Sequence, residues 1–435
     1  MTVSFAFDWV DAAPSQDMAM GQTMAQLSIQ VNGETVTSVR DHGSDARRDH
    51  IVVPLLSVAE WVAGNWCHIW HEIPDTTTTR QKPGFEQRHN LAFAGDGFLF
   101  PKLTMVPSGG GMEKLRWTPW QPQHARIEFV AAGQDCVACN QLQTELEKIV
   151  EAVLERLRSF GHRQDTVVSD LLQDPWEAIK ALDPDEREFC RAAALLGVDP
   201  FAVHQEVADE ITTFWERTGP AIREDMLASL DETETTLPEA AMWLDDTGKM
   251  LEREDAGSGN EWEAIRHRLP MVQVAKPWEQ GYMLARSLRR ALDCGDGRFD
   301  FASSGQPAVT CRETAMPSSR MEGLVAAGTP ACAITKRRRE ETAKRFLLAR
   351  ALGDYMGRSE AGLGILTSMD TVRQGQSRAF AAELLAPAES LRTRLADRGA
   401  AEDVIRDLGQ EFDVSTWVIE HQISNHGLVE PCPRR

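Results

Sequence analysis

The 435-residue sequence has no run of 18 apolar residues, which excludes a conventional membrane-spanning helix. Basic residues are also scarce, because 46 Lys and Arg stand against 66 Asp and Glu and give a formal net charge of -20. Such an acidic chain repels phosphate, so electrostatic binding of nucleic acid or of an anionic membrane over the whole protein surface is not expected. We therefore expect no membrane partner, and we favour a protein partner over nucleic acid.

Histidine is absent from a long part of the sequence, and the cysteines do not cluster. No histidine lies between His267 and His421, so this region cannot build a two-histidine zinc site from its own helices. The eight cysteines are scattered along the chain, which favours reduced thiols over a disulfide framework. The opening MTVSFAFDWVDAAPSQ has early acidic residues, no basic flank and no long apolar core, unlike a signal peptide. We expect a cytoplasmic protein.

The patterns that are present predict an α+β protein of three parts. Residues 1–138 form a strand-rich N-terminal domain, with a hairpin over 27–36 around Asn32 and Gly33. Further strands are predicted at 49–53, 97–106, 112–117 and 125–130. A helix over 57–72, with Ser57 as its cap, carries three of the seven tryptophans found at or before Trp176. A Trp-lined core or interface is therefore expected in this region.

From residue 139 the apolar spacing changes to the helical period. Helices are predicted over 141–160, 185–197, 201–217 and 238–254, and 255–260 (DAGSGN) has the composition of a linker. These residues define a helical middle region, 139–260. A helix over 278–291 and a mostly helical remainder complete the third part, 261–435.

Three segments of the third part share the motifs of one enzyme family. KRFLLARALGDYM (344–356) follows the helix R-F-x-x-A-H-E-x-x-H, and QGQSRAFAAELLAP (374–387) follows E-x-x-A-N-x-F-A-A-x-L-L-x-P. The segment 407–428 contains F-x-V-S ahead of an apolar helix, and 278–292 fits the opening helix. Residues 262–430 thus resemble the ImmA/IrrE family of metallo-endopeptidases. The resemblance implies a zincin-like, mostly helical C-terminal domain.

The same resemblance implies that the catalytic groups are replaced. In that family two histidines and a carboxylate bind zinc, and a glutamate activates the bound water. Arg350 and Asp354 stand at the histidine positions, Ala351 at the glutamate, and Gln374, or Gln376 in a slipped register, at the third ligand. We therefore expect a pseudo-peptidase without zinc or another cofactor. Arg350 and Asp354 are predicted to form an ion pair, with Gln374 as a neutral hydrogen-bond partner.

Two groups in the N-terminal half carry candidate chemistry. Cys67 and His71, with His68 between them, have a spacing that can chelate a metal, although a plain amphipathic helix gives the same pattern. Cys136 and Cys139 form a CxxC ahead of a helix, where a thiol would have a lowered pKa, but chance or simple burial is the preferred explanation over redox or metal chemistry. Neither group has an evident partner motif elsewhere in the chain.

Two further segments suggest contacts with nucleic acid or an acidic partner. The densest basic run consists of Lys336, Arg337, Arg338 and Arg339; it suits such a partner or a solvated helical face. Residues 188–207 have the spacing of a helix-turn-helix, but Gln205 alone suits base reading. Plain helical packing explains that segment as well.

The leading hypothesis is a catalytically inactive ImmA/IrrE-like protein that binds a protein partner. By resemblance, its setting is stress response, phage defence, a toxin-antitoxin module or mobile-element regulation. Two alternatives stay open. One is a metal-dependent hydrolase with a site outside the degenerate motif, at His68, His71 or the CxxC. The other is a DNA-binding transcription regulator that uses the middle helices.

Overall fold

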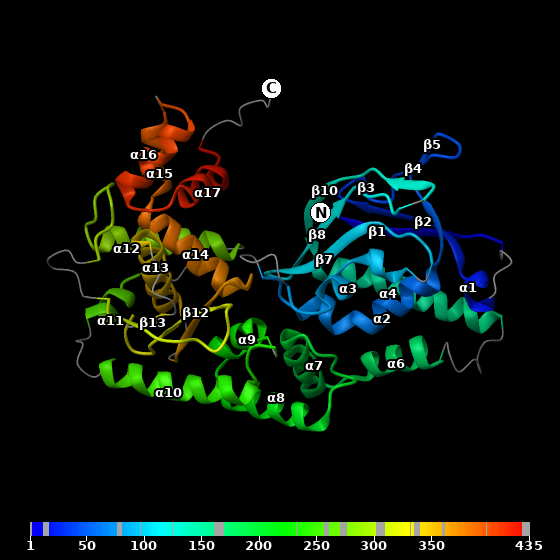
Figure 1. The fold of residues 1–435 in the computed structure, drawn as a ribbon, viewed down its shortest axis with the longest axis horizontal. Coiled ribbons are helices and arrows are strands. Elements are labelled where there is room, and N and C mark those ends of the chain that lie inside the picture. The colour runs from blue at the N-terminus through cyan, green and yellow to red at the C-terminus, as the bar shows by residue number, and fades with distance from the viewer. Residues whose placement is uncertain are drawn as a thin grey trace. The chain divides into compact units, whose positions relative to one another are not determined.

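The chain folds as a mixed helix-and-strand protein, with strands concentrated near the N-terminus and helices following them (Figure 1). The computed structural model describes residues 2–11, 17–75, 81–95, 97–123, 125–160, 169–231, 233–255, 261–269, 276–301, 309–330, 332–334, 340–358, 362–396 and 398–428. Among these residues, no helix has the length and apolarity needed to cross a membrane.

Two compact units divide the chain. Unit 1 comprises Met1–Pro74 and Thr78–Ala208, and unit 2 comprises Asp75–Thr77 and Asp209–Arg435. The boundary falls inside the region 139–260 that was expected to be a separate helical middle. The two halves of that region belong to different units because the helices before residue 205 pack on an N-terminal helix, whereas those after 219 pack on strands of unit 2. The predicted division into 1–138, 139–260 and 261–435 therefore differs from the observed one.

In its described residues, unit 1 contains three small sheets and a set of helices. Its strands are β1 (Val3–Trp9), β2 (Met24–Val31), β3 (Glu34–Thr35), β4 (Val39–Asp41), β5 (Ala46–Arg48), β6 (Ile51–Pro54), β7 (Lys102–Gly109), β8 (Met112–Thr118), β9 (Ile127–Phe129) and β10 (Gly133–Ala138). Its helices are α1 (Met18–Gln22), α2 (Leu55–His71), α3 (Phe85–His89), η1 (Leu91–Ala94), α4 (Cys139–Ser159), η3 (Ser169–Gln173), α6 (Asp174–Ala181) and α7 (Pro184–Leu196).

Antiparallel pairing organises these strands. β2 pairs with β1, β3 and β6, while β8 lies between β10 and β7, and β4 between β5 and β9. The predicted hairpin is confirmed, since Asn32 (φ 49°) and Gly33 (φ 88°) make the turn from β2 to β3 in the left-handed region that these residues tolerate. At the edge of the first sheet, the amide of Phe5 donates to Glu145 Oε2 of α4 at 2.7 Å.

Two long helices, α2 and α4, contact each other, and α4 also packs on β1 (Figure 1). The apolar stripe predicted for α4 is confirmed, because Leu142, Leu146, Ile149, Val150, Val153, Leu154 and Leu157 are all buried. The cap predicted for α2 is wrong. That helix begins two residues earlier, after Pro54, and Ser57 is a buried residue of its first turn whose side chain makes no capping bond.

Unit 2 surrounds a four-stranded sheet with helices. Its strands are β11 (Cys311–Glu313), β12 (Met321–Val325), β13 (Cys332–Ile334) and β14 (Gly364–Thr367). Its helices are α9 (Pro220–Ser229), α10 (Leu237–Asp255), α11 (Glu261–Arg266), α12 (Pro277–Ala291), α13 (Glu341–Gly357), α14 (Val372–Leu385), α15 (Ala388–Leu395), α16 (Glu402–Phe412) and α17 (Thr416–His426). The helix α8 (Gln205–Arg217) spans the boundary between the units.

The helices α12, α13 and α14 pack together in unit 2 (Figure 1). Close approach requires glycine at two contacts: a Cβ added at Gly281 would lie 2.4 Å from the Gln376 carbonyl oxygen, and one at Gly353 would lie 2.4 Å from the Phe380 ring. The strand order is β11-β13-β12-β14, with β11 parallel to β13 and the other pairs antiparallel. This places β14 at an edge of the described sheet, where α9 packs against it.

Candidate functional site

Arg350 lies in the middle of α13 with only 3% of its surface exposed. Its guanidinium forms an ion pair with Glu322 of β12 and donates to the Thr367 carbonyl oxygen at 2.8 Å. It also donates to Gln374 Oε1 of α14 at 2.6 Å and reaches Ser377 Oγ at 3.4 Å. The predicted hydrogen bond between Arg350 and Gln374 is therefore confirmed. The side chain connects two helices and two strands.

Asp354, one turn further along α13, has different partners from those predicted. Its carboxylate contacts Arg358 Nε at 3.0 Å and Arg373 Nη2 at 2.6 Å, and its side chain is 4% exposed. The predicted ion pair between Arg350 and Asp354 is wrong. The reason is that Arg350 pairs with Glu322 of β12, whereas Asp354 pairs with Arg358 and Arg373.

Gln374 is fully buried, and its amide uses its whole hydrogen-bonding capacity. Oε1 accepts from Arg350 and from the Thr367 amide at 2.9 Å. Nε2 donates to Asp225 Oδ2 at 2.9 Å and to the Ile365 carbonyl oxygen at 2.7 Å. A side chain so engaged has no lone pair or proton left for a further ligand.

The remaining motif positions, Ala351 and Gln376, make few polar contacts. Ala351 is completely buried in the apolar core of unit 2 and carries no group that can move a proton. Gln376, the alternative third position, lies against Gly357 near the end of α13, and its Nε2 has no hydrogen-bond partner among the described residues. Of the two registers considered, only the one with Gln374 brings the amide to Arg350.

Asp225 enters this cluster from α9, almost 150 residues before Gln374. Its carboxylate accepts from Thr371 Oγ1 at 2.5 Å and lies 3.9 Å from Arg373 Nε. Only 2% of the residue is exposed. Burial raises the pKa of Asp225, although Arg373 and the hydrogen bonds from Thr371 and Gln374 oppose the shift. We name Asp225, Glu322, Arg350, Asp354, Arg373 and Gln374 the α13–α14 polar cluster.

This donor set does not fit a zinc ion. At the four motif positions stand a guanidinium, a methyl group, a saturated amide and the Asp354 carboxylate, which is already paired with Arg358 and Arg373, and the arginine charges repel a cation. Among the described residues, no group of three or more His, Cys, Asp or Glu side chains is placed to hold a metal. The run Lys336, Arg337, Arg338 and Arg339 lies outside the described residues.

The His68 region of unit 1 is a buried cluster of charged and neutral groups. Glu72 is fully buried and pairs with Arg88, Nη2 to Oε1 at 2.5 Å, and with His89 Nε2 at 3.2 Å. Burial alone would raise the pKa of Glu72, but hydrogen bonds from Arg88 and His89 lower this pKa to about 2. The His68 and His71 side chains have pKa values lowered to about 4, chiefly by burial.

Among the described residues, His68 Nε2 and Trp70 Nε1 of α2 are buried without a hydrogen-bond partner. No described group of three or more His, Cys, Asp or Glu side chains is placed to hold a metal with Cys67 and His71. The spacing that suggested chelation therefore belongs to a helix whose histidines are held neutral by burial.

The CxxC pair is separated in the structure. Cys136 lies on β10, whereas Cys139 is the first residue of α4 and its thiol contacts Glu113 of β8. The expectation of a lowered pKa is wrong, because burial and the nearby Glu113 carboxyl raise the pKa of Cys139 to about 11. Burial raises the pKa of Glu113 itself to about 9. Sequence spacing identified the helix start but not the carboxyl beside it.

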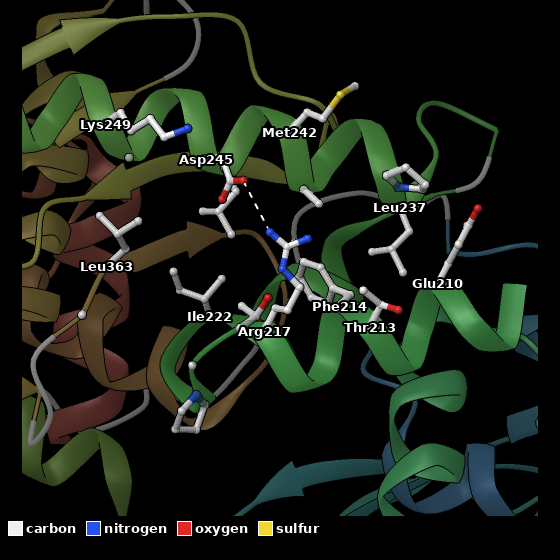
Figure 2. A pocket seen from close by; sticks show the side chains of 18 of the residues that line it. Glu210, Thr213, Phe214, Arg217, Ile222, Leu237, Met242, Asp245, Lys249 and Leu363 are labelled. Atoms are coloured by element: carbon white, nitrogen blue, oxygen red, sulfur yellow. Dashed lines mark ion pairs between the residues drawn. The ribbon is translucent and has the colours of Figure 1, made fainter.

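A groove in unit 2, which sequence patterns did not indicate, has a volume of about 760 Å³. Its floor is apolar, formed by Phe214 of α8, Ile222 of α9, Leu237 of α10 and Leu363 ahead of β14, and Met242 of α10 also lines it, with its side chain pointing away from these residues (Figure 2). Met242 is 62% exposed. We call this feature the α8–α10 groove.

The charged side chains that line the α8–α10 groove are mainly acidic. Asp209, Glu210, Asp245 and Glu252 supply four carboxylates, against the two cations Arg217 and Lys249. Figure 2 shows Arg217 reaching across from α8 to Asp245 of α10, with 4.0 Å between the charged atoms. Both of these side chains are more than half exposed, so the pair is weak and can exchange partners.

No protein-family model matches this chain, and comparison with curated proteins and with solved structures finds no match either.

Proposed function

We propose that this chain is a cytoplasmic, catalytically inactive ImmA/IrrE-like protein with a zincin-like C-terminal region, acting by binding a protein partner. The setting that the resemblance implies is stress response, phage defence, a toxin-antitoxin module or mobile-element regulation. The observation that carries this proposal is the environment of Arg350. A buried, fully paired guanidinium occupies the position where the resembled enzymes place their first zinc ligand.

One further feature supports an inactive site. Asp225 of α9 lies beside Gln374 and accepts a hydrogen bond from its Nε2, so the chain's own side chains fill the space next to the motif.

Zinc analysis tests the inactive-site part of the proposal. The purified full chain, incubated with zinc sulfate and dialysed, is expected to retain far less than one zinc per chain by mass spectrometry of the metal. The Asp354→Asn variant should retain equally little zinc, because Asp354 forms ion pairs with Arg358 and Arg373 and not with a metal. Stoichiometric zinc that disappears in Asp354→Asn would contradict the proposal.

The α8–α10 groove is the surface we assign to the partner. Its apolar floor suits the apolar face of a protein segment, and its four carboxylates favour basic residues at the flanks of that segment. The overall charge of -20 attracts such a partner at longer range. The occupant is therefore a protein segment with an apolar face and flanking Lys or Arg.

Site-specific photo-crosslinking tests this assignment in the native host. With p-benzoylphenylalanine in place of Met242, ultraviolet light is expected to join the chain to another protein through an apolar segment flanked by Lys or Arg. The matched control places the same amino acid at Trp417 of α17, which is 52% exposed and outside the groove. A partner captured equally at both positions, a second copy of this chain, or no protein adduct would each contradict the assignment.

A further inference from the structure

Two cysteines that are far apart in the sequence meet inside unit 1. Cys67 is on α2 and Cys190 is on α7, and these helices pack against each other. Both are free cysteines, exposed by 6% and 4%, and they form a small buried cluster with Ala194. Their side chains are therefore in contact inside unit 1.

The thiol pair is reachable because both cysteines line a cavity of about 490 Å³. Trp66, Trp70 and Trp176 form part of the same wall, and the Trp66 ring meets the other two edge to face, with centroids 5.1 Å apart in each case. A small oxidant that enters this cavity therefore meets two thiols and three indole rings.

The two sulfur atoms are not equivalent. Contact with Cys67 lowers the pKa of Cys190, whereas the same contact and burial raise the pKa of Cys67. The thiolate is the reactive form of cysteine, and whichever sulfur reacts first has the other beside it to resolve the product. The CxxC lacks this arrangement, because Cys139 contacts Glu113 and its pKa is raised.

We propose that Cys67 and Cys190 are a redox-active pair that a peroxide converts into a reversible disulfide linking α2 to α7. The thiolate of one cysteine attacks one peroxide oxygen and the O–O bond breaks, which leaves a sulfenic acid on that cysteine and, after protonation, one water. The sulfur of the other cysteine then attacks the sulfenic sulfur, and the hydroxyl leaves with a proton as a second water. Two thiols and one hydrogen peroxide thus give one disulfide and two waters, and a dithiol reductant reverses the change.

The bond would fix α7 against α2 beside the tryptophan wall. Because it joins residues 67 and 190, it restricts the unfolded chain over a long loop and should raise the thermal midpoint of unit 1. It also places a disulfide, which quenches indole fluorescence, next to Trp66. Both effects are independent of the α8–α10 groove and of the proposed partner.

Peptide mapping of the full chain tests this inference. The reduced protein is treated with hydrogen peroxide, quenched with N-ethylmaleimide in guanidinium chloride and digested without reductant. We expect a linked peptide pair containing Cys67 and Cys190, a loss of two titratable thiols, reduced tryptophan fluorescence, and reversal of all three by dithiothreitol. The mapping separates this product from any bond between Cys311 and Cys332, which face each other across β11 and β13.

Cysteine variants test whether the disulfide joins Cys67 to Cys190. Cys190→Ser should abolish the linked pair and leave Cys67 as a free thiol, whereas Cys136→Ser with Cys139→Ser should leave it unchanged. Full alkylation of both Cys67 and Cys190 after peroxide treatment of the wild-type chain would overturn the proposal. Their recovery in disulfides with other cysteines or between chains would do the same. Because these outcomes are measured on the wild-type protein, they do not depend on the folding of any variant.

Discussion

Replacing Arg350 with methionine should lower the free energy of unfolding of unit 2 by about 3–5 kcal/mol. Methionine keeps much of the side-chain volume but leaves Glu322 without its arginine partner and removes donors from Gln374 and the Thr367 carbonyl. An uncompensated charge inside a protein costs several kcal/mol, and the polar groups around it lose their hydrogen bonds as well. Denaturant unfolding followed by circular dichroism measures the change.

Two controls separate the charge effect from packing. Arg350→Met combined with Glu322→Gln should recover part of the loss, because it removes the carboxylate charge that Arg350 balances in the wild type. Arg406→Met, at an exposed pair with Glu402 on α16, should change stability by no more than about 0.5 kcal/mol. A loss below about 1 kcal/mol for Arg350→Met would show that the guanidinium is not held in the buried network described above.

Glu113→Gln should stabilise unit 1 increasingly as the pH rises. Burial raises the pKa of Glu113 to about 9 from its ordinary value of 4.5, which the unfolded chain retains. Between these two pH values the folded chain holds a proton that the unfolded chain has released, so the wild-type free energy of unfolding falls by about 1.4 kcal/mol per pH unit. This contribution is complete below pH 4.5 and is lost as the pH rises through 9.

Glutamine is neutral throughout and preserves the shape of the protonated carboxyl. Its advantage over the wild type should therefore grow to about 3 kcal/mol at pH 7. Urea unfolding curves at pH 5, 7 and 9 measure it, with Glu155→Gln on the exposed side of α4 as the matched control. Parallel pH profiles for the wild type and Glu113→Gln would show that the carboxyl is solvated, contrary to its 2% exposure.

Local patterns predicted the local structure well. The hairpin at Asn32 and Gly33 and the buried stripe of α4 depend on the turn preferences and helical spacing of neighbouring residues, and both are confirmed. The cap at Ser57 was wrong because the preceding strand β6 passes directly into α2 at Pro54, so the helix was already formed at the serine. Cap rules identify a helix start only when a loop precedes it.

The polar cluster was predictable only along its own two helices. The positions of Arg350 and Gln374 within their motifs predicted that these side chains would meet. Glu322 and Asp225 come from β12 and α9, and no spacing in the sequence relates them to Arg350 or Gln374. The contact between Cys67 and Cys190 was hidden for the same reason, because it depends on how α7 packs on α2.

The interlocking of the α13–α14 polar cluster has an evolutionary consequence. Arg350 is bound to Glu322 and Gln374, and Gln374 in turn to Asp225. A change at one of these positions removes a partner from a buried charge or amide. The resulting decrease in the free energy of unfolding, several kcal/mol, is a large share of the 5–15 kcal/mol by which a domain is stable. Natural variants should therefore alter these positions together or not at all. Introduction of a metal-binding residue at position 350 alone would give a poorly folded protein and be removed by selection.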